Sequence, residues 1–345
     1  MGRILVTGGS GYIGSHTVVA LLEAGYEVVS IDDHSRSHDF IMDRIKQITG
    51  TEVVNHRINL VDRATLEDFF CNEHTGITGV IHFAAYKAVG ESVANPLLYF
   101  ENNLVGQINL MRCVDQYNIP HFVFSSSCTV YGNPESLPVT ESSPLLEPES
   151  PYGRTKLIGE AFLRDWVLVC PTRVAALRYF NPVGAHPSAL IGEFSRGVPE
   201  NLLPYITQTA AGIRERLTIY GRDYPTRDGT CVRDYLHVCD VALAHVAALK
   251  HLERHTDAPP FDVFNLGSGV GQTVLEMVQA FEEVTGTPLT YTFGERRTGD
   301  VVAVYADNRK AREQLGWSTL YSLQDMLRTA WAWEQALSQS HNTRQ

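Results

Sequence analysis

A glycine-rich turn close to the start of the chain constrains the fold more than any other feature of the sequence. The apolar run Arg3–Thr7 predicts a strand, and the residues beyond the turn predict a helix that ends near Gly25. A second strand is expected at Glu27–Ile31. Between the first strand and the helix, three glycines have the spacing G-x-x-G-x-x-G: Gly8, Gly11 and Gly14. This order is typical of the first βαβ unit of a dinucleotide-binding sheet.

Each glycine is expected to have its own role in such a turn. Gly8 permits a tight turn, Gly11 lets the backbone approach a pyrophosphate, and Gly14 lets the helix pack closely on the strand. The positive end of the helix then faces the phosphates. Asp32 ends the second strand, where a carboxylate accepts hydrogen bonds from a ribose and repels a 2′-phosphate. The sequence therefore predicts NAD in preference to NADP, even with Arg36 nearby.

Strand and helix patterns keep alternating through the first half of the chain. Asp62 is expected to cap a helix over residues 63–70, and Asn95 with Pro96 to start one long helix that ends near Tyr117. Further buried strands are expected at residues 52–58, 79–83, 122–126 and 173–178. This alternation predicts an α/β fold with a doubly wound parallel sheet of the Rossmann type.

The composition changes after Asn181, since residues 182–204 are rich in proline and glycine, as at a domain boundary or an active-site loop. We expect a dinucleotide-binding domain at residues 1–180 and a second, smaller α/β domain at 181–345. Part of residues 232–255 is expected to pack back on the first domain. The shorter elements expected in the second half are helices at 201–211, 238–250, 273–285 and 322–337 and strands at 217–220 and 262–265.

Charge and cysteine content exclude several classes of function. A net charge of −11 argues against a nucleic-acid surface. The six cysteines form no Cys-x-x-Cys pair, which indicates free thiols in a reducing compartment and no zinc site. The sequence contains no run of about 18 apolar residues, so no membrane span is expected. The first residues enter a strand without a signal peptide, so we expect a cytoplasmic protein that binds neither metal, membrane nor nucleic acid.

A tyrosine and a lysine four residues apart form a candidate acid–base pair. Ser150 is a good N-cap and Pro151 suits the first helical position, so Tyr152 and Lys156 are expected one turn apart on one helix face. An ammonium beside a phenol favours the phenolate, so the pKa of Tyr152 is expected to fall below its reference value near ~10. Such a group can act as a general base or acid close to neutral pH.

The carboxyl ends of two other predicted strands add candidates. Ser127, the last of three serines after residue 124, is expected to hydrogen-bond Tyr152 and a substrate oxygen; the alternative is that all three only end a strand. Cys128 is interpreted as a packing residue. Lys87 is expected to contact the cofactor, the alternative being a surface lysine. Asn102 and Asn103 lie inside a predicted helix, where asparagine is unfavourable, so a polar role is expected; the alternative is a solvent-facing side chain.

Seven blocks of sequence give a resemblance to a known family. With them the chain resembles the extended short-chain dehydrogenases/reductases and, more closely, the UDP-glucose 4-epimerase family, over nearly its whole length. The glycine turn and Tyr-x-x-x-Lys are shared by many relatives, whereas the blocks that contain Asn181 and Arg233 are more specific to the epimerases. The blocks, in the order of the family, are residues 7–16, 82–92, 125–132, 150–156, 178–187, 232–238 and 265–269.

The resemblance implies interconversion of UDP-glucose and UDP-galactose with a tightly held NAD, as an isomerase of galactose and carbohydrate metabolism. Tyr152 would take the proton of the sugar 4-hydroxyl while hydride passes from the same carbon to the nicotinamide. The 4-keto sugar would turn in the site and take hydride back on its other face. Lys156 would hydrogen-bond the nicotinamide ribose and stabilise the phenolate, and Ser127 would orient the 4-oxygen.

The glycine turn and the resemblance together predict the binding residues. The residues expected to bind NAD are Gly8, Gly11, Tyr12, Ile13, Gly14, Asp32, Asp33, His34, Ser35, Arg36, Ser37, Asn59, Leu60, Phe83, Ala84, Ala85, Tyr86, Lys87, Asn102, Ser127, Tyr152, Lys156 and Phe180. The residues expected to bind the UDP-sugar are Ser127, Tyr152, Asn181, Asn201, Leu202, Thr218, Ile219, Tyr220, Arg233, Arg297, Asp300 and Val304.

The resemblance places Arg233 and Arg297 on the diphosphate, because their forked donors fit phosphate oxygens, and Asp300 on the uridine ribose. Without it, Arg297 is interpreted as a solvated side chain, Tyr220 as a core residue of an edge strand, and Asp33 as a solvated loop acid.

Two positions depart from the family's pattern. Asn59 stands where the family usually has an aspartate that contacts adenine, and an amide can both donate and accept there, so NAD binding should persist. Val304 stands where members restricted to glucose and galactose carry a tyrosine beside the sugar. Because valine leaves room, we hypothesise that N-acetylated UDP-sugars are also accepted.

Two other functions compete with this interpretation. A nucleotide-sugar 4,6-dehydratase needs an extra acid and base after the catalytic serine or threonine, and here Ser127 is followed by Cys128 and Thr129. A non-catalytic NAD-binding sensor would tend to lose Tyr152 or Lys156, and both are present. The resemblance further suggests a homodimer, formed through the long helix that ends near Tyr117.

Overall fold

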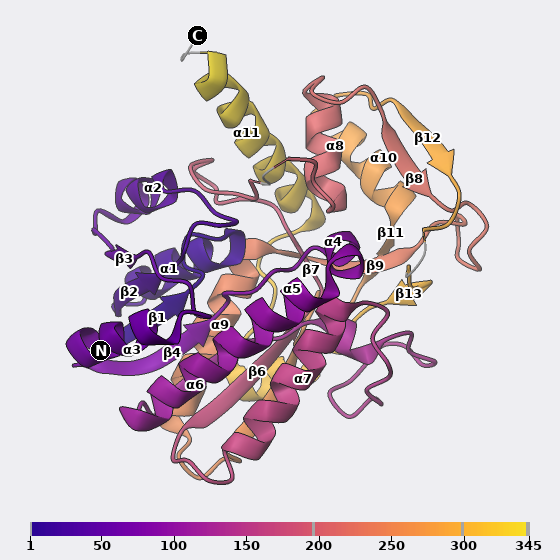
Figure 1. The fold of residues 1–345 in the computed structure, drawn as a ribbon. Helices are drawn as coiled ribbons and strands as arrows, with labels where there is room; N and C mark the ends of the chain where they lie inside the picture. Colours follow the sequence, from indigo (N-terminus) through magenta and orange to yellow (C-terminus); the bar gives the residue numbers. More distant parts are fainter. Residues whose placement is uncertain (1, 195–196, 298–299, 343–345) are drawn as a thin grey trace.

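The computed structural model describes residues 2–194, 197–297 and 300–342, and a seven-stranded parallel sheet lies at its centre (Figure 1). The strand order is β10-β6-β5-β4-β1-β2-β3, so the order reverses beside β1. The strands are β1 (Arg3–Thr7), β2 (Glu27–Ile31), β3 (Asn55–His56), β4 (Ile77–His82), β5 (His121–Ser125), β6 (Arg173–Tyr179) and β10 (Phe261–Leu266). This confirms the predicted doubly wound α/β fold, in which ligands bind at the carboxyl edge beside the reversal.

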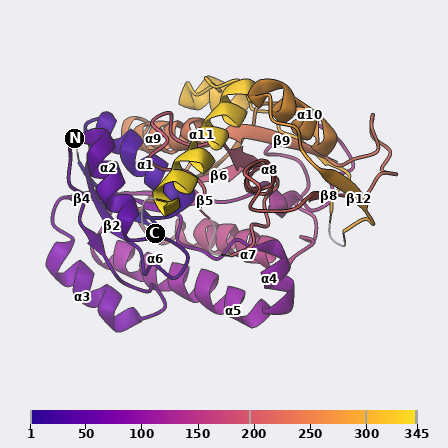
Figure 2. The ribbon, with the colours of Figure 1, turned by 90° about the horizontal axis from the view of Figure 1, so that it is seen from above.

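Helices cover both faces of this sheet, and Figure 2 shows the two layers from above. One layer contains α1 (Tyr12–Glu23), α2 (Phe40–Thr49) and α9 (Val238–Arg254); the other contains α3 (Arg63–Glu73), α6 (Gly106–Gln116) and α7 (Pro151–Trp166). Side chains alternate along β1 between the two cores, since Ile4 and Val6 face the α1 and α9 layer and Leu5 the other. Both faces are therefore buried, as parallel strands require.

Two predictions about the first half need correction. The strand expected at residues 52–58 shrinks to β3, because it pairs only with the last two residues of β2, at the edge of the sheet. The long helix expected from Pro96 is interrupted: α5 (Pro96–Phe100) passes through a π-helical turn, η1 (Glu101–Val105), before α6. Such turns often mark functional sites. The short helix α4 (Val89–Ala94) precedes α5.

The second half builds smaller sheets over the carboxyl edge of the large one. A small four-stranded sheet is made of β9 (Val232–His237), β11 (Gly271–Thr273), β13 (Ala303–Val304) and β7 (Asn181–Val183). A parallel pair is made of β8 (Leu217–Tyr220) and β12 (Tyr291–Gly294). The helices there are α8 (Leu202–Ala210), α10 (Val274–Thr285) and α11 (Leu323–Asn342), which share one apolar core.

The chain returns to the first sheet twice from the second half. The helix α9 packs against α1, and β10 forms the outer strand beside β6. A division at residue 180 therefore cuts the sheet, and the two-domain boundary stays a prediction. Two short elements, η2 (Cys128–Tyr131) and η3 (Ala311–Leu315), complete the description. Among the described helices, none has the length and apolarity to cross a bilayer.

Candidate active site

The glycine turn meets the end of β4 at the carboxyl edge of the sheet. Gly8 has a φ of 75°, and a Cβ on it would lie 2.9 Å from the backbone nitrogen of Ala84. A Cβ on Gly14 would lie 2.1 Å from the carbonyl oxygen of Gly8. Only glycine fits at these two positions, because the obstructing atoms are backbone. The result is a tight cradle that leads to the N-terminus of α1, which fits the pyrophosphate of a dinucleotide.

The turn after β2 is organised by Asp32. Its Oδ2 accepts from the backbone nitrogen of Ser10 (3.0 Å), and its Oδ1 accepts from the backbone nitrogen of His34 (3.0 Å) and the hydroxyl of Ser37 (2.8 Å). Asp33 accepts from the backbone nitrogen of Ser35 at 2.8 Å. The Asp32 carboxylate thus links the glycine turn to the segment expected to hold the adenosine ribose.

Arg36, from the same segment, is paired with a carboxylate. Its Nη2 lies 2.6 Å from Oε1 of Glu91, and its guanidinium lies 4.5 Å from the ring centroid of Tyr86. Glu91 also accepts from the hydroxyl of Tyr99 (2.7 Å). The charge of Arg36 is therefore offset within the chain, which agrees with the preference for NAD over NADP.

The other expected cofactor residues lie around this cradle. Tyr12 starts α1 and donates to the carbonyl of Gly184 (2.7 Å). Ile13 packs on the apolar core between the sheet and the layer of α1 and α9. Asn59 accepts from the backbone nitrogen of Val61 at 2.9 Å. Those that are buried or packed against buried residues include Leu60, Phe83, Ala84 and Phe180.

Lys87 and the asparagine pair differ in detail from the expectation. Lys87 is more than half exposed and pairs with Glu193, 2.7 Å away. Asn102 donates to Asn103 at 3.0 Å. The buried Asn103 holds the backbone of Tyr86. Its Oδ1 accepts from the backbone nitrogen of Tyr86 (2.8 Å), and its Nδ2 donates to the carbonyl of Tyr86 (3.0 Å). The polar role expected of the two asparagines therefore falls to Asn103, which lies with Asn102 in the π-helical turn.

The helix α7 begins as the sequence predicts. The hydroxyl of Ser150 accepts from the backbone nitrogen of Gly153 at 3.2 Å, with Pro151 in the first turn. This places Tyr152 and Lys156 on a buried face, beside the serines that follow β5. Tyr152 is hydrogen-bonded to Ser127.

The expected direction of the Tyr152 pKa is wrong. Burial raises the pKa of Tyr152, and the hydroxyl of Tyr179 adds to this, against the bond from Ser127. Lys156 is not among the main influences on this pKa, since its Nζ donates to the carbonyl of Ser125 (2.7 Å) and lies 5.9 Å from the Tyr152 ring centroid. Burial in turn lowers the pKa of Lys156 to about 8. Desolvation outweighs the neighbouring charge here, and spacing alone does not reveal it.

A second cluster of candidates lies on the second half of the chain. Asp300 accepts from Nη2 of Arg297 at 2.9 Å and lies 3.5 Å from Nη2 of Arg233. Arg297 lies 5.6 Å from the ring centroid of Tyr220, whose side chain is 46% exposed and so is no core residue. Arg296, next to it, pairs with Asp223. The structure therefore brings the two expected diphosphate ligands to one carboxylate.

The remaining substrate candidates lie on neighbouring elements. Asn201 precedes Leu202 at the start of α8 and donates to Glu193 at 2.6 Å. Thr218 and Ile219 lie on β8. The Oδ1 atom of Asn181 is buried without a hydrogen-bond partner among the described residues, as a group that waits for a ligand would be. Val304 is buried on β13, in register with Arg233 of β9.

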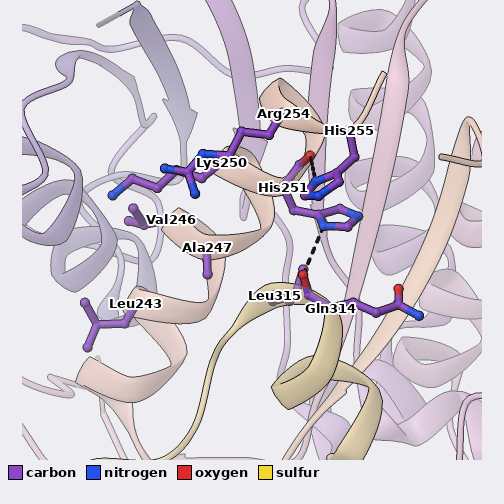
Figure 3. Close-up of a pocket in the computed structure, with 9 residues that line it drawn as sticks. All are labelled: Leu243, Val246, Ala247, Lys250, His251, Arg254, His255, Gln314 and Leu315. Carbon is purple, nitrogen blue, oxygen red and sulfur yellow. Dashed lines mark hydrogen bonds between the residues drawn. The ribbon is translucent and has the colours of Figure 1, made fainter. Parts of the chain in front are cut away.

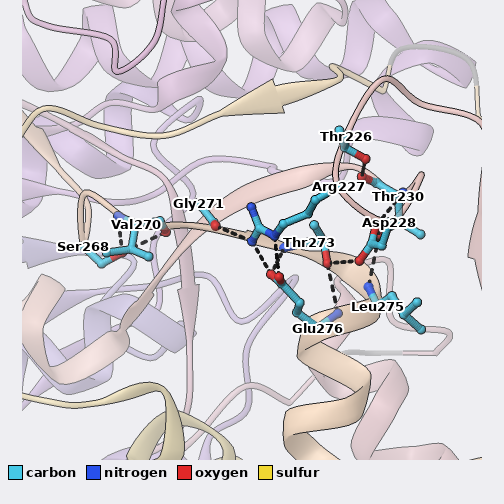
Figure 4. A network of polar contacts seen from close by, with 10 residues as sticks. All are labelled: Thr226, Arg227, Asp228, Thr230, Ser268, Val270, Gly271, Thr273, Leu275 and Glu276. Atoms are coloured by element: carbon cyan, nitrogen blue, oxygen red, sulfur yellow. Dashed lines mark hydrogen bonds and ion pairs between the residues drawn. The ribbon is translucent and has the colours of Figure 1, made fainter.

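A polar network anchors the loop that leads into β9 (Figure 4). Arg227 pairs with Glu276 and also donates to the carbonyl of Gly271 (2.8 Å). Thr273 caps α10 and bonds Asp228. These contacts fix the segment just before Arg233. The Thr-x-x-Glu capping box at residues 273–276 was a readable signal for this anchor.

A surface pocket elsewhere is not the site. It lies between α9 and η3 and is lined by Leu243, Lys250, His251 and Gln314, among others (Figure 3). None of the predicted site residues lines it. Within the described part of the chain, no three histidine, cysteine or acidic side chains gather as a metal site.

Comparisons with known proteins agree with the fold. Residues 5–330 match the family model described as GDP-mannose 4,6 dehydratase. A UDP-glucose 4-epimerase of Bacillus subtilis (strain 168) is 48% identical over 96% of this chain and 96% of its own length.

Two solved structures are also similar. A UDP-glucose-4-epimerase from Stenotrophomonas maltophila, with bound NAD and formylated UDP-arabinopyranose, has a TM-score of 0.94 and 44% identity over 99% of this chain and 100% of its own. A UDP-glucose 4-epimerase from Bifidobacterium longum, in complex with NAD+ and UDP, has a TM-score of 0.92 and 43% identity over 97% of this chain and 98% of its own.

Proposed function

The chain belongs to the UDP-glucose 4-epimerase family, and from that premise we propose that it interconverts UDP-glucose and UDP-galactose with a tightly bound NAD. One observation carries the proposal: Ser127, Tyr152 and Lys156 gather in a buried cluster beside a glycine cradle. The paired Arg233 and Arg297 supply the cationic site that a nucleoside diphosphate needs in an acidic protein.

The residues of the chain divide the work at the sugar 4-position. Tyr152 takes the proton of the 4-hydroxyl and later returns it, and Ser127 holds the 4-oxygen in reach. When bound, NAD would supply a reversible hydride acceptor and a positive charge in the site. That charge is needed, because burial alone raises the pKa of Tyr152. Lys156 presents its ammonium to the nicotinamide ribose.

The second half holds the nucleotide while the sugar turns. Arg233 and Arg297 bind the diphosphate by exchanging their shared partner Asp300 for phosphate oxygens, and Asp300 then accepts from the uridine ribose. Asn181 reaches the diphosphate with its unpartnered side chain. The uridine pocket is lined by Asn201, Leu202, Thr218, Ile219 and Tyr220.

The residues of the site argue against both competing functions. A dehydratase requires an acid and a base after Ser127, whereas burial raises the pKa of the neighbouring Cys128 to about 12 and Thr129 does not titrate. A non-catalytic sensor would have no use for the assembled Tyr152 and Lys156. The family model that matches takes its description from a dehydratase, and residues 128 and 129 distinguish this chain from that activity.

The decisive assay uses purified protein and UDP-galactose. We expect UDP-glucose to accumulate to equilibrium without consumption of added NAD. A stable 4-keto-6-deoxy sugar would indicate a dehydratase, and no product at all would indicate a sensor.

The second part of the proposal is that the protein also accepts N-acetylated UDP-sugars, and it rests on Val304. Its side chain is buried beside Arg233, where a valine leaves more room than a tyrosine. Val304→Tyr should abolish turnover of UDP-N-acetylglucosamine and preserve that of UDP-glucose. Wild-type protein that is inactive on the acetylated sugar would refute the idea, and the ratio of rates on UDP-galactose and UDP-N-acetylgalactosamine measures it.

A homodimer and a cytoplasmic location complete the proposal. The apolar side chains of Val93 and Leu97 are 62% and 80% exposed on α4 and α5, beside the exposed Val89, Leu98 and Val105. A second copy would cover this surface. Leu97→Glu should give a monomer in light scattering, while Leu320→Glu, at an exposed leucine elsewhere, should leave the dimer intact. The described cysteines are all free thiols, which supports a reducing compartment.

A further inference from the structure

Ser125, which ends β5, and the next two serines each have a different partner. The hydroxyl of Ser125 bonds the hydroxyl of Tyr179, and its carbonyl accepts from Lys156 (2.7 Å). Ser127 bonds Tyr152. Between them, the hydroxyl of Ser126 donates to a carboxylate that the proposed mechanism does not use, that of Glu160.

Glu160 forms a buried ion pair with Arg178 of β6. Two parallel bonds join them, from Nε to Oε1 (2.9 Å) and from Nη2 to Oε2 (2.6 Å). Their side chains are 1% and 2% exposed. The third donor of Arg178 reaches the hydroxyl of Tyr131 (3.0 Å), which donates to Asn265 (2.6 Å). Each nitrogen of the Arg178 guanidinium and each oxygen of the Glu160 carboxylate therefore has a hydrogen-bond partner, and the contacts extend from α7 to η2 and β10.

A buried ion pair is weak support for stability, because removing two charges from water costs as much as their attraction returns. A pair of apolar side chains of similar volume would serve packing as well. Glu160 also lies one helical turn beyond Lys156 on α7, and it bonds the middle residue of the turn that carries Ser125 and Ser127. This placement indicates a role in the site.

We propose that Glu160 is a positioning residue of the catalytic centre: it fixes the serine turn through Ser126, and its negative charge holds the ammonium of Lys156. The inference rests on the proposed function for its kinetic consequence. The position of the turn decides where Ser127 meets Tyr152, and the charge decides whether Lys156 keeps its proton.

The groups that face Lys156 from each packed element support the second part. From β4 comes His82, whose pKa burial lowers to about 3, so that it is neutral; its Nδ1 lies 2.7 Å from the hydroxyl of Thr7. From β5 come the Ser125 carbonyl and the ring of Phe124, whose centroid lies 5.1 Å from Nζ.

Tyr179 and Arg178 face this region from β6, and the charge of Arg178 is already bonded to Glu160. Tyr152 lies one turn earlier on α7. Burial lowers the pKa of Lys156 to about 8, and among the charged groups named here Glu160 is the one that raises it. Without Glu160, the lysine would lose its proton close to neutral pH.

The test is the pH profile of Glu160→Gln in the holoenzyme. Removing the negative charge lowers the pKa of Lys156, so the basic limb of kcat against pH should move to lower pH by about one unit. The KM for UDP-galactose should stay within about twofold, because the nucleotide is held elsewhere. At a pH one unit above the wild-type limb, kcat should fall about tenfold relative to wild type.

Two control variants separate charge from structure. Ser126→Ala removes the bond to the turn but leaves the charge, so kcat should fall at every pH with no shift of the limb. Glu334→Gln changes another buried glutamate, which accepts from Thr207 (2.9 Å) far from the serine turn, and should leave the profile unchanged.

Two further measurements keep the inference open to refutation if Glu160→Gln does not fold or the chain does not epimerise. The double variant Glu160→Leu with Arg178→Met replaces the pair by apolar side chains and should shift the limb in the same direction but by less, because the charge of Arg178 is removed with that of Glu160. A 13C-lysine NMR titration, with Lys156 assigned through Lys156→Arg, should show a lower pKa in either variant whatever the activity. An unmoved lysine pKa and an unmoved basic limb would overturn the proposal, since a purely structural Glu160 predicts both.

Discussion

The catalytic cluster on the first half and the cationic cluster on the second half of the chain are held in opposite ways. Around Tyr152 and Lys156 the polar groups are buried and bonded to one another, down to the Glu160–Arg178 pair. Around Asp300 the guanidinium of Arg297 is 55% exposed and bonds a single carboxylate. The groups of the first cluster are held by bonds within the chain, whereas the second has partners that a diphosphate can replace. The catalytic cluster must keep its reacting groups at fixed distances. The cationic cluster must bind only the nucleotide, so that the sugar is free to turn.

The largest effect is expected from Tyr152→Phe, which removes the acid–base group and leaves the ring. Its kcat should fall by about 10³-fold or more, because the group that takes the proton is removed and only its ring remains. Dinucleotide content, measured by absorbance after denaturation, should stay at the wild-type value. Undiminished exchange of the two sugars in this variant would contradict the assignment.

The next effect compares the two clusters directly through stability. Arg178→Ala leaves the buried Glu160 charge unpaired and should lower the free energy of unfolding by about 3–5 kcal/mol. Arg297→Ala opens an exposed pair and should change it by less than about 1 kcal/mol. Denaturant unfolding of the two holoenzymes measures the contrast. Equal losses would mean that the two regions are not built differently.

A smaller and more selective effect is expected from Arg233→Gln. Loss of a charge-assisted bond to phosphate should raise the KM for UDP-galactose about 10- to 100-fold, a change of about 1.5–3 kcal/mol. The pH profile should stay in place, because Arg233 is distant from Lys156 in the proposed mechanism. Unchanged UDP binding in calorimetry would remove Arg233 from the nucleotide site.

The smallest effect is expected from Asp300→Asn. It frees both arginines from their ion pairs but removes an acceptor for the uridine ribose, and these two changes oppose each other. We expect the affinity for UDP to change by about threefold or less. The affinity for inorganic phosphate should be higher in the variant than in the wild type. A large loss of UDP affinity with no gain for phosphate would show that Asp300 is not a competitor for the arginines.

Local patterns in the sequence predicted the elements that depend on local chemistry. The glycine turn, the strands β1, β2 and β8, the Asp62 cap and the start of α7 at Ser150 are as predicted, because each rests on a few adjacent residues. The return of β10 to the large sheet was not predicted, since the pairing of Phe261–Leu266 with β6 is set by contacts distant in sequence.

The candidate site followed the same rule. The positions of Tyr152 and Lys156 were predictable from helical spacing, but the direction of the Tyr152 pKa was not, because burial is a property of the whole fold. Glu160 was missed for the same reason. In the sequence it is an ordinary helix residue, and only the packing of α7 against β6 pairs it with Arg178.

The most direct test of the central claim follows the hydrogen at carbon 4 of the sugar. UDP-galactose carrying deuterium at that carbon, incubated with the protein in ordinary water, should give UDP-glucose that retains the deuterium. The account predicts this, because hydride leaves and returns to the same carbon within one closed site while Tyr152 handles only the hydroxyl proton. Loss of the label to solvent would contradict it.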